Sequence, residues 1–153
     1  MKIYKLDPYC GIGSFSFGMS EERFRAIANP KNSFLYGFPE RNRLCLDCGD
    51  LFGFFSLNRA LNSVSLFPAF SIEYHGQISE VSCEIESTVR QLKRIADDLK
   101  HIPNESCYVS MMLGFVMCYE DCHVSNVLVF SRDYYEEENK YLIEHFGVTK
   151  FGL

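Results

Sequence analysis

The chain has no apolar run that approaches the length of a membrane-spanning helix, and its first residues lack the apolar segment of a signal peptide. These absences predict a cytoplasmic protein. Basic residues are also few, with 15 Lys and Arg against 20 Asp and Glu, which gives a formal net charge of −5. Because nucleic acids and anionic membranes attract clustered basic residues, we expect neither a direct nucleic-acid partner nor a membrane partner.

No stretch carries the signature of a known catalytic site. Gly11, Gly13 and Gly18 precede a helix start, but their spacing fits neither of the common phosphate-binding loops. Glu21 and Glu22 follow them and would repel an anion at the helix N-terminus. We therefore predict no catalytic residues, no cofactor and no enzymatic activity.

Apolar residues are plentiful, at 47% of 153 residues, and predict one packed domain over residues 1–153. Fourteen Phe and nine Tyr exceed what a small core needs, so we expect some of them at a contact surface. The seven Cys are scattered among apolar segments of the sequence. In a reducing compartment such residues are most often small buried hydrophobes, and disulfides are not expected.

The first third of the chain predicts a strand at 2–6 and then a short helix. Ser20 is a suitable N-cap for this helix, which Asn29 and Pro30 end. Residues 51–55 fit a buried strand, and 56–64 fit a short helix begun by Ser56.

Two later stretches, 70–81 and 115–127, resemble each other and each predict a β-hairpin. In both, a Phe lies four residues before a Tyr, a polar turn follows, and the return arm has the pattern apolar-Ser-x-Val. The second stretch has one more turn residue. Its first arm, 108–117, is nearly all apolar and predicts a central strand that is covered on both faces or that contacts a partner.

Two further helices are predicted. The first is capped by Ser87 or Thr88 and continues to Leu99 before Pro103. The second has a capping box of Asp133 and Glu136 and ends at Gly147. Tyr135, Leu142, Ile143 and Phe146 form a predicted stripe along one side of this helix.

The order of these elements predicts an α+β fold, in which an antiparallel sheet carries helices on one face. The repeated hairpin suggests two duplicated helix–hairpin units, 1–86 and 87–153. The two hairpins should then lie side by side in one sheet, with 32–67 as an insertion in the first unit.

The Cys and His residues allow two alternative functions. Cys45, Cys48, Cys118, Cys122 and His123 offer the ligand types of a zinc site, although the spacing departs from the usual knuckle. Cys48 or Cys122 could also act as a nucleophile beside His75, His123 or His145. No local signature supports either alternative, and we expect no metal site.

Carboxylates interleaved with Tyr are the arrangement that best fits a binding role. Acidic residues and exposed Tyr can hold a basic protein surface through complementary charge and aromatic contact. The alternative is that three Glu in a first helical turn only complement the helix dipole. The predicted partner-binding residues are Glu120, Asp121, Tyr134, Tyr135, Glu136, Glu137 and Glu138.

The stretch 11–22, GIGSFSFGMSEE, resembles the Gly-Met-Ser helix unit of tandem-repeat β-lactamase inhibitor proteins and of small bacterial immunity proteins encoded beside polymorphic or contact-dependent growth-inhibition toxins. The second unit has no such motif at 86–88. The resemblance implies an immunity-type inhibitor that binds and neutralises a cognate toxin domain with a basic surface, such as a nuclease. The alternatives are a thiol- or zinc-dependent enzyme and a structural or adaptor domain.

Overall fold

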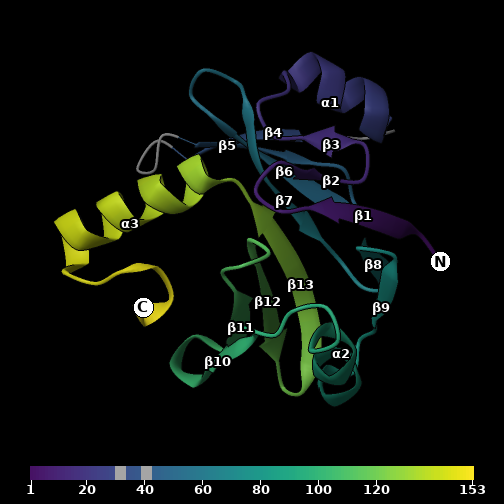
Figure 1. The fold of residues 1–153 in the computed structure, drawn as a ribbon. Coiled ribbons are helices and arrows are strands. Elements are labelled where there is room, and N and C mark those ends of the chain that lie inside the picture. Colours follow the sequence, from purple (N-terminus) through teal and green to yellow (C-terminus); the bar gives the residue numbers. More distant parts are fainter. Residues whose placement is uncertain (30–33, 39–42) are drawn as a thin grey trace.

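The computed structural model describes residues 1–29, 34–38 and 43–153, and within them two β-sheets and three α-helices (Figure 1). The smaller sheet has five strands, in the order β3 (Phe15–Ser16), β2 (Gly11–Ile12), β1 (Ile3–Asp7), β8 (Phe70–Tyr74) and β9 (Gln77–Val81). The larger sheet has eight, in the order β10 (Lys100–Ile102), β11 (Cys107–Ser110), β12 (Phe115–Glu120), β13 (His123–Phe130), β7 (Leu61–Leu66), β6 (Leu51–Ser56), β5 (Arg43–Asp47) and β4 (Phe34–Phe38).

The helices are α1 (Glu21–Ala28), α2 (Ile85–Leu92) and α3 (Arg132–Phe146), with short 3-10 turns at Pro103–Glu105 and Lys150–Gly152. Among the described strands, every pairing is antiparallel except that of β1 with β8. The predicted α+β class is therefore confirmed. Within the described part of the chain, no helix combines the length and the apolar character needed to cross a membrane.

The larger sheet is covered on both faces, and β12 shows this directly. Phe115 and Met117 belong to the main core, which also contains side chains from the smaller sheet, α1 and α2. Val116 and Cys118 alternate with them and point to a second cluster on the opposite face, formed with Tyr134 of α3 and the C-terminal segment. The prediction of a central strand covered on both faces is confirmed for β12.

Helix α1 is attached to the larger sheet through Phe24. The Ser20 hydroxyl accepts a hydrogen bond from the Arg23 N–H at 3.2 Å, so the predicted N-cap is confirmed. The Phe24 ring is fully buried and lies against Gly53 of β6, where a Cβ would come within 2.5 Å of the ring. Gly53 therefore makes room for the aromatic side chain that fixes α1.

The predicted helix at 56–64 is wrong, because residues 61–66 form strand β7. This strand lies between β6 and β13, and all six of its residues are buried. Pairing on both sides outweighs the weak helical periodicity of a short run. Of the expected insertion 32–67, residues 32, 33 and 39–42 lie outside the described residues, and much of the remainder forms β4 to β7.

Both predicted hairpins exist, as β8–β9 and β12–β13. The prediction that they lie side by side in one sheet is wrong, since they belong to different sheets. Strand β8 pairs with β1, whereas β13 pairs with β7. The helices also do not share one face: α1 and α2 contribute to the main core, and α3 to the cluster behind it. Two duplicated units are therefore not confirmed.

The extra residue of the second hairpin does not lie in its turn. Each hairpin has a two-residue turn with positive φ at both positions, His75–Gly76 in one and Asp121–Cys122 in the other. This is the geometry of a type I′ turn. Strand β13 instead absorbs the extra residue in a bulge, where the register shifts between Cys118 and Tyr119.

Three predicted element boundaries need correction. Helix α2 begins at Ile85 and ends at Leu92, and Thr88 lies inside it, where its hydroxyl bonds to Ser82 instead of capping the helix. Residues 93–99, where the helix was expected to continue, form turns instead, and β10 follows them. The apolar arm 108–117 is divided by a turn before β12, in which the Gly114 N–H donates to Ser110 O.

Candidate interaction surface along helix α3

Helix α3 leaves the larger sheet directly from the end of β13. Ser131 is its N-cap, because the hydroxyl accepts from the Tyr134 N–H at 3.1 Å; the predicted capping role of Asp133 is wrong. The helix ends at Gly147, whose φ of 66° is left-handed, as predicted. Because the helix continues from β13, its position is set by the centre of the larger sheet.

Most of α3 projects from the body of the molecule (Figure 1). Of its fifteen residues, all of them described, only Tyr134 and Glu138 are buried. Ile143 is 53% exposed and Phe146 is 65% exposed. Of the predicted stripe, Tyr135 packs against the second core cluster, whereas Ile143 and Phe146 are exposed and do not belong to the core.

The C-terminal segment holds α3 to the sheet. Phe151 is buried, stacks on Tyr135 and lies tilted against Phe130, with ring centroids 6.4 Å apart in both pairs. The Lys150 ammonium lies 3.5 Å from the carboxylate of Glu138, which is only 2% exposed. The Lys150 N–H also donates to the side chain of Asn139. These contacts fix the first half of α3 and leave its outer side open.

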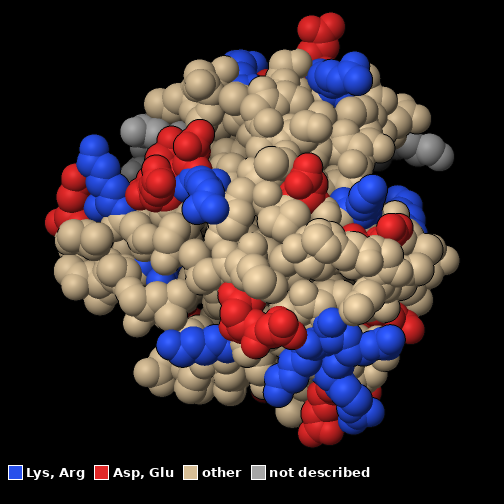
Figure 2. Space-filling view, viewed as in Figure 1, with Lys and Arg blue, Asp and Glu red and all other residues tan. Residues whose placement is uncertain are grey.

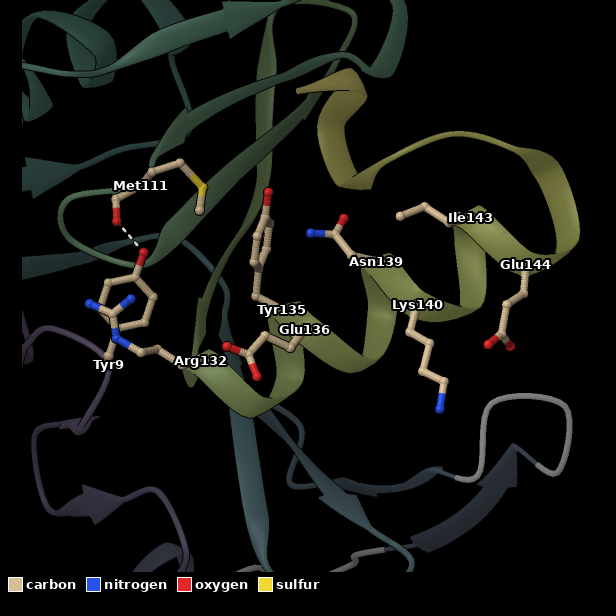
Figure 3. A pocket seen from close by; sticks show the side chains of 9 residues that line it. All are labelled: Tyr9, Met111, Arg132, Tyr135, Glu136, Asn139, Lys140, Ile143 and Glu144. Atoms are coloured by element: carbon tan, nitrogen blue, oxygen red, sulfur yellow. Dashed lines mark hydrogen bonds between the residues drawn. The ribbon is translucent and has the colours of Figure 1, made fainter.

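A groove of about 590 Å³ follows the outer side of α3 (Figure 3). At one end the Tyr9 hydroxyl donates to the carbonyl oxygen of Met111, and the Arg132 guanidinium lies 4.3 Å from the centre of the Tyr9 ring. Burial raises the pKa of Tyr9, while the charge of Arg132 opposes this rise. The groove is lined by Tyr9, Met111, Arg132, Tyr135, Glu136, Asn139, Lys140, Ile143 and Glu144.

A second groove, of about 450 Å³, borders the start of α3. It is lined on one side by Asp133 and Glu137, both exposed, and on another by the turn between β6 and β7, which includes Asn58. Tyr9 and Arg132 line both grooves. This pair therefore forms the boundary between them.

The predicted partner-binding residues of α3 divide into two groups. Glu136 and Glu137 are exposed, and Tyr135 is half-buried in the first groove. Tyr134 and Glu138 are 4% and 2% exposed and support the helix from inside. They are therefore not available to a partner in this conformation.

Glu120 and Asp121 lie far from α3. Both are exposed at the turn that precedes β13, whereas α3 follows the other end of that strand. Eight strand residues span about 23 Å at roughly 3.3 Å per residue. The predicted acidic residues therefore lie on two separate surfaces, and a single side chain of a partner cannot contact both.

The structure does not bring together the cysteines considered for zinc. Cys45 lies in β5 and Cys118 in β12, with β13, β7 and β6 between them. At roughly 4.8 Å per strand this separation is about 19 Å. Among the described residues, no group of three or more His, Cys, Asp or Glu is arranged to hold a metal ion.

One of the two thiols considered as nucleophiles is held in its unreactive form. Burial raises the pKa of Cys48 to about 11, which disfavours the reactive thiolate. The three histidines make other contacts: His75 stacks on Tyr74, His145 stacks on Tyr141, and the Nδ1 atom of His123 lies 2.8 Å from Asp121 O.

Sequence reasoning did not identify Tyr9, Met111, Arg132 or Lys140 as groove residues. A signal was present for part of the set, because Arg132, Glu136, Lys140 and Glu144 recur every four residues and therefore follow one side of a helix. Tyr9 and Met111 carry no such signal. They reach α3 only through the packing of two turns that are distant in sequence.

Comparison of the chain with protein-family models, with curated proteins and with solved structures gave no match. The function must therefore be inferred from the surface itself.

Proposed function

We propose that this protein is an immunity-type inhibitor that binds and neutralises a cognate bacterial toxin domain, as in contact-dependent growth inhibition. The toxin surface is basic, as expected of a nuclease. The observation that carries the proposal is the exposed acidic flank of α3, where Asp133 and Glu137 border the second groove. Carboxylates at the rim of a groove attract and orient Lys and Arg side chains of a partner.

Charge is unevenly distributed over the visible face of the molecule (Figure 2). Lys and Arg gather around α2 and the turn after it, where Lys93 and Arg94 are exposed, while Asp and Glu are prominent over the start of α3. A basic partner would be repelled by α2 and attracted by the α3 flank. This polarity favours α3 as the docking site.

The proposal is tested by co-expressing the protein with the toxin domain encoded beside it. We expect protection from the toxin and a stable complex, whose affinity falls as salt is raised because exposed charges are screened. If the protein neither protects the cell nor forms a complex with the toxin domain, the proposed immunity function is wrong.

Two matched double variants then locate the interface. Asp133→Lys with Glu137→Lys should weaken the complex at least about tenfold, since two attractive contacts become repulsive. Glu120→Lys with Asp121→Lys makes the same change in charge at the other end of β13. If only this second variant loses affinity, the toxin binds at the hairpin turn and the α3 site is wrong.

A further inference from the structure

The outer side of α3 carries charges of alternating sign. Arg132, Glu136, Lys140 and Glu144 follow one another at four-residue intervals and line the same groove. All four are exposed. Within the described part of the chain, no ion pair includes Glu136, Lys140 or Glu144. These four residues are called the charge stripe below.

The charge stripe is complementary to itself when one copy is reversed. An antiparallel second helix places Glu144 opposite Arg132 and Lys140 opposite Glu136, and the same two contacts recur on the other side of a two-fold axis. A parallel arrangement in register would place each charge opposite its own copy. Self-complementarity under a two-fold axis is the property that an isologous dimer interface requires.

The apolar residues fit the same arrangement. The first half of the groove offers Tyr9, Met111 and Tyr135, and the second half of α3 presents Ile143 and Phe146, 53% and 65% exposed. With the axis near Glu138, Phe146 lies eight residues, or about 12 Å, from the centre. Reversal therefore brings Phe146 of one copy to the level of Tyr9 and Met111 in the other.

We infer that the groove along α3 takes the α3 helix of a second copy of this chain, in an antiparallel pair related by a two-fold axis. The stripe has two positive and two negative residues, so it offers no net attraction to a basic toxin surface. Its alternation instead matches its own reversed copy. This inference does not rest on the proposed function, since the acidic flank of Asp133 and Glu137 borders the other groove.

Light scattering and sedimentation of the full chain test the inference. The wild type should be a dimer at about 0.5 mM, a concentration that reveals even micromolar association. Glu136→Lys places like charges opposite each other at two symmetric contacts, and so does Lys140→Glu. Each variant should raise the dissociation constant at least about tenfold. Both side chains are exposed, so both variants should fold.

Two rescue measurements distinguish pairing through the stripe from a general charge effect. An equimolar mixture of the two single variants restores opposite charges and should form a heterodimer, and the double variant Glu136→Lys with Lys140→Glu should again form a homodimer. Glu137→Lys, one residue away on the flank, serves as the control and should dimerise like the wild type.

Two results would overturn the inference. A wild type that is monomeric at this concentration would do so, as would single variants that dimerise like the wild type, because the interface would then lie elsewhere. If the wild type is monomeric and Glu136→Lys abolishes toxin binding, the groove belongs to the toxin. Loss of toxin binding by the flank variants alone concerns the proposed function only and leaves the dimer unaffected.

Discussion

The hairpins β8–β9 and β12–β13 have similar sequences and the same type of turn, yet they occupy different positions in the fold. Strand β9 is the edge of the smaller sheet, and its Ile78 is 49% exposed. Strand β12 lies inside the larger sheet, and its Phe115 and Val116, which point to opposite faces, are both buried. The pattern of a hairpin thus determines its local form, while the number of apolar faces decides whether it is peripheral or central.

The largest expected difference in stability between the two hairpins comes from placing a charge on the face of β12 that packs against the second core cluster. Val116→Asp would bury an unpaired carboxylate in the cluster behind β12 and should cost about 3–5 kcal/mol. Ile78→Asp, in the edge hairpin, should change stability by no more than about 0.5 kcal/mol. Urea unfolding of both variants measures this contrast. Equal losses would mean that the two hairpins are equally buried.

High pH should destabilise the protein through Cys107 of β11, the strand that pairs with β12. Burial raises the pKa of Cys107 from 9.0 to about 12. Below pH 9 the thiol is neutral in both states; as pH rises from there toward 12, the unfolded chain loses its proton first and stability falls. At pH 10 the loss is about 1.4 kcal/mol, the value of one pKa unit.

The comparison of Cys107→Val with the wild type at pH 8 and pH 10 isolates this thiol. The variant should lose less stability between the two pH values, and Cys122→Ser, changed at an exposed turn, should lose as much as the wild type. A wild-type loss equal to that of Cys107→Val would contradict the assignment.

Substitutions in the two hairpin turns should change stability by smaller amounts and in opposite directions. Gly76 and Cys122 occupy the same turn position, with φ of 77° and 64°. A methyl group at Gly76 would meet no atom within 4 Å, so Gly76→Ala should cost only the left-handed backbone energy, about 1 kcal/mol. Cys122→Gly removes that energy and should stabilise the protein by up to about 1 kcal/mol. Thermal unfolding should show melting temperatures that move in opposite directions.

The smallest effect is expected at the tip of the central hairpin. Glu120 and Asp121 are exposed, so Glu120→Lys with Asp121→Lys should alter the free energy of unfolding by no more than about 0.5 kcal/mol. This result would qualify the double variant as the control in the toxin-binding assay. A larger loss in urea unfolding would show that the tip supports the fold.

The sequence predicted local structure well where one physical signal was strong. Ser20 and Gly147 were recognised as helix ends because their side-chain chemistry and backbone freedom act within one turn. The first part of strand β7 was predicted as a helix because its burial depends on β6 and β13, which no local pattern reveals. Likewise, the similar sequences of the two hairpins could not show that β8 pairs with β1 and that β13 pairs with β7.

The candidate site was predicted only in part, for a related reason. Exposed Glu136 and Glu137 were identified from charge, but Tyr134 and Glu138 of the same helix face the interior and are buried. Which side of α3 faces inward is decided by Phe130 and Phe151, from two other segments. Charge alone cannot supply that orientation.

The pair formed by Tyr9 and Arg132 has a consequence for regulation. Since both residues line both grooves, a ligand that displaces the pair in one groove also changes the walls of the other. If both proposed binding events occur, thermodynamic linkage makes the effect reciprocal: the factor by which self-association alters toxin affinity equals the factor by which toxin alters self-association. A single cation–π contact would thus set how strongly the two binding events cooperate or compete.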